Sequence, residues 1–388
     1  MPSLIRTSVF VALASTFGFL PVLAGSGPGD AQPYDSLEAW GEALFFDPNL
    51  SANRSQSCAS CHDPAAGFVD PREAAPGAAA SLGDDGVSLG DRNAPTAAYA
   101  ALTPEFGRDA EGEWVGGQFL DGRAATLEAQ AEGPILNPIE MGMPDIESVL
   151  ARLQEDPQHA ATLRARLGDK ADDPKAAYAE ITAAIAAFER TEQFQPFDSK
   201  YDRYLRGEVK LTDEEELGRL LFFSKQFTNC NICHQVGTSQ VAENETFSNY
   251  RYFNIGVPEN TALREANGQA GVVDHGLLQN PAVDDPEADG RFKVPTLRNV
   301  AVTGPYMHNG VFADLETVVR FYNHYNSRRP EAQINPETGL PWGPPEVPGT
   351  VAMTELETGP ALDDQRIAAI VAFLKTLTDS RYEYLLDK

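Results

Sequence analysis

Two short cysteine motifs carry the clearest chemical signal in this sequence. They read Cys58-Ala59-Ser60-Cys61-His62 and Cys230-Asn231-Ile232-Cys233-His234, and together they use all four cysteines of the chain. A C-x-x-C-H segment is typical of covalent haem c attachment, in which both thiols bond to haem vinyl groups and the histidine becomes an axial ligand of the iron. The sequence therefore predicts two covalently bound haem c groups per chain.

Two other interpretations compete with haem attachment. Each motif could be a redox or disulfide turn followed by an incidental histidine, but the chain has only six histidines in 388 residues, so two such coincidences are improbable. A zinc site would need four ligands gathered in one place, whereas these motifs stand far apart in the chain. Haem attachment remains the favoured interpretation.

The residue on the other face of each iron separates an electron carrier from an enzyme. No histidine occurs between Asp63 and Gln158, so the first haem has no nearby histidine as second axial ligand, although Met141 or Met143 could serve. An iron with an open position would bind hydrogen peroxide or another small molecule.

Similar segments flank both cysteine motifs. Gly41–Phe46 precedes the first motif and Gly218–Phe223 the second, and Ala184–Thr191 matches Ala369–Thr376 further along. Two copies of such a frame indicate duplication of a domain. We expect one haem domain at residues 25–195 and the other at 196–388.

These repeated segments predict helices. Ser36 and Thr212 are candidate N-caps of the two opening helices, and the closing segments space their apolar residues for one buried face. The Gly- and Pro-rich regions Pro64–Asn93 and Asn254–Asp289 predict loops and short turns, and Gln193–Lys210 predicts the connection between halves. We expect a mainly α fold of two cytochrome c-like haem domains with long irregular loops.

An ordered series of further motifs resembles the bacterial dihaem cytochrome c peroxidases and their MauG-like branch, from about Leu37 to Leu377. The motifs are Phe45-Phe46-Asp47-Pro48, the first C-x-x-C-H, Arg92-Asn93-Ala94-Pro95-Thr96, Asp121-Gly122-Arg123-Ala124, Gln130, Gly133-Pro134, Glu140-Met141-Gly142, Lys293–Val300 and Gly304–Gly310. The resemblance implies that the first haem is peroxidatic and high-spin, whereas the second is low-spin and transfers electrons.

The resemblance also implies roles for single residues. Tyr322, fourteen positions after His308, takes the place of the second haem's distal ligand, with His324 as its rival. Glu140 matches the distal acid–base carboxyl, and Gln130 and Pro134 match positions of the distal pocket. The members' calcium site between the domains maps onto Asn93, Thr303 and Pro305, whose oxygens suit that ion.

The chain departs from the family pattern at two places. It lacks the histidine that classical members carry in the loop before Arg92, which implies an open first haem in the oxidised protein. Leu120 stands where relatives usually have a tryptophan between the haems, and Trp114 is a candidate substitute.

The function implied is a dihaem peroxidase that uses hydrogen peroxide. In the MauG-like form it oxidises Trp or Tyr side chains of a partner protein through high-valent haem iron. The alternatives are a cytochrome c peroxidase that draws electrons from a small redox protein, and a non-catalytic electron-transfer dihaem cytochrome.

The net charge and the N-terminal segment limit which partners and which cellular location are expected. The formal net charge of −27 disfavours nucleic-acid binding and favours a protein partner with a basic face. Arg6, the apolar run that follows it and Val22-Leu23-Ala24 predict a signal peptide at residues 1–24. No other stretch is long and apolar enough for a membrane span, so the mature protein is expected in the periplasm.

Overall fold

The computed structural model describes residues 31–237 and 241–387, so the predicted signal peptide, residues 1–24, lies outside the described part. The helices are α1 (Leu37–Phe45), α2 (Cys58–Cys61), α3 (Leu127–Leu136), α4 (Ile146–Gln154), α5 (Pro157–Leu167), α6 (Pro174–Glu189), α7 (Lys200–Leu205), α8 (Asp213–Phe222), α9 (Thr261–Ala266), α10 (Leu315–Asn326), α11 (Met353–Leu356) and α12 (Asp364–Lys375). Short strands pair antiparallel as β1 (Gly107–Arg108) with β2 (Trp114–Val115), and β3 (Tyr252–Phe253) with β4 (Phe292–Lys293). The predicted mainly α fold is confirmed.

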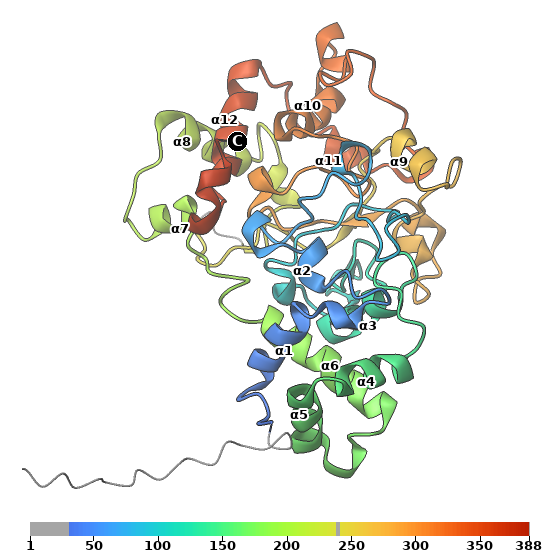
Figure 1. Ribbon diagram of the computed structural model, residues 1–388. Coiled ribbons are helices and arrows are strands. Elements are labelled where there is room, and N and C mark those ends of the chain that lie inside the picture. The colour runs from blue at the N-terminus through green and yellow to red at the C-terminus, as the bar shows by residue number, and fades with distance from the viewer. Residues whose placement is uncertain (1–30, 238–240, 388) are drawn as a thin grey trace, which may run out of the picture.

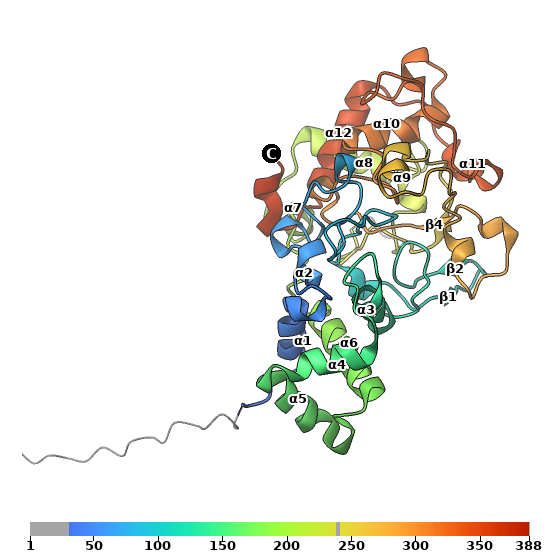
Figure 2. The ribbon, with the colours of Figure 1, turned by 45° about the vertical axis from the view of Figure 1, so that its right-hand side comes forward.

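The helices form two groups, with the long loops of both halves between them (Figures 1 and 2). Helices α1 and α3–α6 gather at one end, and α8, α10 and α12 gather at the other. No helix in the described ranges is long and apolar enough to cross a membrane.

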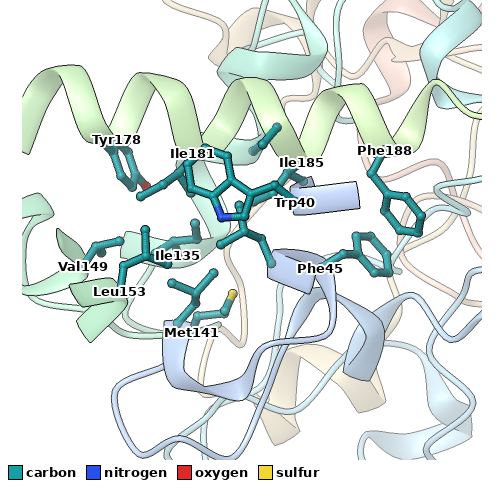
Figure 3. Packing of buried hydrophobic residues seen from close by; sticks show 14 of the residues in the cluster. Trp40, Phe45, Ile135, Met141, Val149, Leu153, Tyr178, Ile181, Ile185 and Phe188 are labelled. Atoms are coloured by element: carbon teal, nitrogen blue, oxygen red, sulfur yellow. The ribbon is translucent and has the colours of Figure 1, made fainter. Parts of the chain in front are cut away.

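Each group has its own hydrophobic core. In the first, Trp40 and Phe45 of α1 pack against Ile181, Ile185 and Phe188 of α6 (Figure 3). In the second, α8 packs against α12, whose apolar side chains were predicted to share one buried face and are indeed buried: Ile367, Ile370, Phe373 and Leu374. These separate cores support the predicted division at 195/196, which stays a prediction.

The same close helix contact occurs in both cores. A Cβ atom added to Gly41 of α1 would lie 1.9 Å from the carbonyl oxygen of Ala184, and one added to Gly218 of α8 would lie 1.8 Å from that of Ala369. Only glycine allows the paired helices to approach so closely. The repeated geometry is what a duplicated domain predicts.

We expect Gly41→Ala and Gly218→Ala each to lower the free energy of unfolding by about 1–3 kcal/mol or more, because the added methyl group must push two helices apart. Chemical denaturation of the holoprotein measures this change. Gly349→Ala is the control, since a Cβ atom there meets nothing within 4 Å. Equal stability of the Gly41 variant and the control would contradict the prediction.

Helix caps explain where the opening helices begin. The Ser36 hydroxyl accepts a hydrogen bond from the Ala39 amide at 3.1 Å, and the Thr212 hydroxyl accepts one from Glu215 at 3.2 Å. Both predicted caps are confirmed.

Two short helices lie in the segments that were predicted as a loop region and as the connection between halves. Helix α9 interrupts the region Asn254–Asp289 and is capped by Asn260, and α7 lies within the connection Gln193–Lys210. The prediction of only loops and turns in Asn254–Asp289 was wrong, because a single cap stabilises a helix too short to show apolar periodicity.

Candidate active site

Both cysteine motifs open into one interior cavity of about 800 Å³. Cys58, Cys61 and His62 line it from the first half of the chain. The second half contributes Cys230, Cys233, His234 and Tyr322. The two halves thus share a single cavity, and both sets of predicted haem residues face it.

The two motif histidines are held in the same way. His62 Nδ1 lies 3.1 Å from the carbonyl oxygen of Phe68, and His234 Nδ1 lies 3.0 Å from that of Phe247. A metal-binding histidine usually donates its second ring nitrogen to such an oxygen, which fixes the ring and leaves Nε2 for the metal. Burial lowers the pKa of His62 and lowers that of His234 to about 4, so both rings are neutral, as iron ligands must be.

The cavity wall also carries buried charge. Arg92 donates from Nε to Asp274 at 2.6 Å and from Nη1 to Asp121 at 2.7 Å. On the same wall, His308 Nε2 and Glu346 Oε2 lie 3.7 Å apart, and neither has a hydrogen-bond partner among the described residues. Unpaired polar atoms beside a large cavity fit a bound group that itself carries polar substituents, as haem does with its propionates.

The predicted distal residues of the first haem gather on one part of this wall. Gln130 and Pro134 lie one turn apart on α3, and Glu140 follows that helix; all three line the cavity. Burial raises the pKa of Glu140, while Arg123 and a hydrogen bond from Asn137 oppose the shift. A carboxyl whose pKa is raised holds a proton more readily than an exposed glutamate, which suits a group that accepts and returns one.

Tyr322 lies on α10, where it faces the cavity, whereas His324 does not line it. His324 instead packs against Tyr325, with 3.9 Å between the ring centroids, and against Trp342 at 5.6 Å. Positions i and i+2 point to different sides of a helix. The structure therefore presents Tyr322 to the second motif, and its role as iron ligand stays a prediction.

Tyr322→Phe is expected to abolish the low-spin ferric signal of the second haem, because the phenyl ring offers the iron no oxygen. Electron paramagnetic resonance of the oxidised holoprotein measures this loss, against one high-spin and one low-spin haem in the unaltered protein. His324→Gln is the matched control on the same helix. Retention of the low-spin signal in Tyr322→Phe would exclude the tyrosine ligand.

The three tryptophan residues pack in the hydrophobic clusters beside the cavity and do not line it. Leu120 lines the cavity, but Trp114 stacks on Phe106 at 5.0 Å, and the Arg108 guanidinium lies 4.0 Å from the Trp114 ring. Trp40 belongs to the first core, and Trp342 packs on Phe312. Among the described residues, no tryptophan lines the cavity, whereas Leu120 does, and the role of Trp114 stays a prediction.

The predicted calcium ligands Asn93, Thr303 and Pro305 all line the same cavity. The backbone N–H of Asn93 donates to the backbone carbonyl oxygen of His308 at 2.8 Å. This hydrogen bond joins the two halves of the chain beside the predicted calcium ligands. Within the described ranges no group of three or more His, Cys, Asp or Glu side chains could hold a metal ion. A calcium ion here would depend on amide and carbonyl oxygens, and it stays a prediction.

Several cavity residues were not predicted from the sequence. Glu189 is buried, and burial raises its pKa to about 8. Tyr99, also buried, hydrogen-bonds to Asp379 across the two halves. Neither shows a distinct local pattern; Glu189 and Tyr99 stand out only once tertiary structure brings them to the cavity.

Comparisons with known proteins decide the family. Residues 35–210 match the family model described as di-haem cytochrome c peroxidase. The chain is 54% identical over 380 residues to the methylamine utilization protein MauG of Paracoccus denitrificans, covering 97% of each protein. The chain belongs to the dihaem cytochrome c peroxidase and MauG family. It is an oxidoreductase of the MauG-like branch, and this family implies the two haems that the motifs predict.

Solved structures agree with this assignment. The diheme peroxidase BthA of Burkholderia thailandensis E264 is 33% identical and aligns with a TM-score of 0.80, covering 91% of this chain and 88% of that one. A MauG-like protein associated with microbial copper homeostasis is 31% identical with a TM-score of 0.66, covering 91% and 92% of the two chains. The dihaem fold therefore extends over nearly the whole chain.

Proposed function

We propose that this protein uses hydrogen peroxide to oxidise Trp or Tyr side chains of an exported partner protein. The placement of Tyr322 in one cavity with both haem-attachment motifs is the observation that carries the proposal. A phenolate is an anionic ligand that lowers the reduction potential of its iron. A haem with such a ligand is suited to hold an oxidising equivalent, whereas a methionine-ligated haem is suited to receive an electron.

The motif residues would hold the cofactors: Cys58, Cys61 and His62 the first haem, and Cys230, Cys233, His234 and Tyr322 the second. Bound haem supplies the redox chemistry, the reduction of peroxide and the withdrawal of electrons from a donor. Glu140 would take the proton from the near oxygen of peroxide and return it to the far one. Gln130 and Pro134 would shape that pocket, and Asn93, Thr303 and Pro305 would hold calcium between the halves.

The surface beside the second motif suits a protein partner. Large apolar side chains around this motif are exposed: Leu220, Phe227, Ile232 and Val236. Helix α8, which precedes this motif in the chain, begins with four acidic residues, Asp213–Glu216, and two of them are paired with Lys200 and Arg219. The net charge of −27 favours a partner with a basic face, and salt should weaken the association. We propose that the partner docks here, in the periplasm, after residues 1–24 are removed.

Mass spectrometry of a candidate partner tests the proposal. The holoprotein is mixed with hydrogen peroxide and an exported protein encoded beside it, and the partner is weighed intact and after proteolysis. We expect a stable, peroxide-dependent mass change on Trp or Tyr. Rapid turnover with a reduced small cytochrome and no change in any partner would instead support the cytochrome c peroxidase alternative. An oxidised optical spectrum that peroxide leaves unchanged would support the electron-transfer alternative.

A further inference from the structure

A buried tyrosine–carboxylate pair joins the two halves of the chain. The Tyr99 hydroxyl donates to Asp379 Oδ1 at 2.6 Å, and Asn299 Nδ2 donates to the other carboxylate oxygen at 2.8 Å. Tyr99 and Asp379 are each 1% exposed, and Tyr99 also lines the cavity that both haem motifs share. A phenol in this position can lose an electron and a proton together, because a carboxylate already accepts its hydrogen.

A short series of contacts connects Tyr99 with the histidine of the first motif. The Tyr99 amide donates to the Phe194 carbonyl oxygen at 3.0 Å. The Phe194 ring stacks on Phe68 with 4.1 Å between centroids and 25° between planes. The Phe68 carbonyl oxygen is the one that His62 Nδ1 contacts. Bonded and stacked atoms therefore extend from the first haem ligand to Tyr99.

A comparable series reaches the second motif. The Arg298 guanidinium lies 5.4 Å from the Tyr99 ring centroid and also 5.4 Å from that of Phe247. The Phe247 carbonyl oxygen is the one that His234 Nδ1 contacts. Tyr99 thus occupies the middle of a route between the two iron-binding histidines.

Other residues of the cavity wall are less suited to redox chemistry. Leu120 cannot be oxidised by one electron, and no tryptophan among the described residues lines the wall. The hydroxyl of Tyr306 donates to the backbone carbonyl of Val300 at 3.0 Å, and a carbonyl is too weak a base to keep the proton. The Tyr99 hydroxyl differs from that of Tyr306, because its hydrogen-bond acceptor is a carboxylate.

We propose that Tyr99 is a redox relay between the two haems and that Asp379 receives its proton. The inference rests on the proposed oxidation by hydrogen peroxide, which is the oxidant. In the forward step the Tyr99 O–H bond breaks, one electron passes to the oxidised haems, and the proton passes to Asp379 Oδ1. The nearby cation of Arg298 disfavours a positively charged ring, so the proton must leave with the electron. When a donor returns the electron, Asp379 returns the proton.

Electron paramagnetic resonance tests the relay independently of turnover. The holoprotein, grown with ring-deuterated tyrosine or without it, is frozen at short times after one equivalent of peroxide, and its optical spectrum is recorded in parallel. We expect a neutral tyrosyl radical signal that deuteration narrows. Tyr99→Phe should abolish this signal, and Asp379→Asn should shorten its lifetime. Tyr178→Phe should retain it, because that buried hydroxyl also donates at 2.6 Å, but to the backbone carbonyl of Glu132.

The outcomes separate the relay from the proposed function. A changed optical spectrum without any tyrosyl signal, or with a signal that survives in Tyr99→Phe, overturns the relay alone. An optical spectrum that peroxide leaves unchanged overturns the proposed function and the relay with it. If Tyr99→Phe binds fewer than two haems, fluorotyrosine at position 99 keeps the hydrogen bond, and absence of fluorine splitting in the signal overturns the relay.

Discussion

Glu140→Gln is expected to slow the reaction with hydrogen peroxide by about 10²–10⁴-fold, the usual contribution of a positioned acid–base group, while both haems stay bound. Glutamine keeps the shape of the side chain but cannot accept a proton. Stopped-flow absorbance at low peroxide concentration measures the rate. Glu132→Gln is the matched control, because Glu132 lies on the same helix as Gln130 and Pro134, but its side chain is exposed and does not line the cavity.

The pH profile gives a second test of Glu140. Its carboxylate form must accept the first proton, so the rate should fall as the pH drops through the Glu140 pKa. Burial raises that pKa, which places the loss of rate above the pH expected for an exposed glutamate. A variant that reacts at the unaltered rate, with an unaltered profile, would leave Glu140 without a role in peroxide chemistry.

Asp202→Ala is expected to lower the free energy of unfolding by about 3–5 kcal/mol, because it leaves a buried guanidinium without its partner. Arg298 and Asp202 are 1% and 4% exposed. Each terminal nitrogen of Arg298 donates to one carboxylate oxygen of Asp202, and the bond from Nη2 to Oδ1 is 2.9 Å long. Denaturation of the holoprotein measures the effect. Glu155→Ala is the control, since its paired contact with Arg54 is solvent-exposed and should be worth about 0–1 kcal/mol.

The Arg298–Asp202 pair should also impose a pH dependence on stability. Burial alone would raise the pKa of Asp202, but the hydrogen bonds from Arg298 outweigh it and hold the pKa below the usual 3.8. The stabilisation is therefore present above that value and is lost as the pH falls through the lower pKa of the folded protein. The double variant Asp202→Leu with Arg298→Met should be more stable than Asp202→Ala. Equal losses in Asp202→Ala and Glu155→Ala would contradict this account.

Sequence patterns predicted those features that depend on short segments of chain. The C-x-x-C-H motifs, the caps at Ser36 and Thr212, and the buried faces of α6 and α12 all follow from spacing within one or two turns of helix. The placement of Tyr322 at the cavity needed a motif count from His308, because one tyrosine on a helix looks like any other.

Contacts between distant segments could not be predicted in this way. Tyr99 and Asp379 are 280 positions apart, and nothing near either residue marks it as a partner. Arg298 belongs to a recognisable motif, but its pairing with Asp202 depends on how α7 folds against the second core. The sequence alone shows that Leu120 stands at the position where relatives usually have a tryptophan. The tertiary structure is needed to show that Trp114 stacks on Phe106 and does not line the cavity.

The shared cavity also has a consequence for how haem is attached to this protein. Burial raises the pKa of the Cys58 and Cys233 thiols to about 12, and it raises that of Cys61 and Cys230 as well. A thiol with such a pKa is ionised to only about 1 part in 10⁵ at neutral pH, whereas an unfolded chain has thiols near 8.5. All four sulfur atoms line the cavity, so we expect haem to attach faster to the unfolded chain, whose thiols ionise more readily, than to the folded one. Haem attachment to the holoprotein is therefore expected to precede the packing of the two halves around the cofactors.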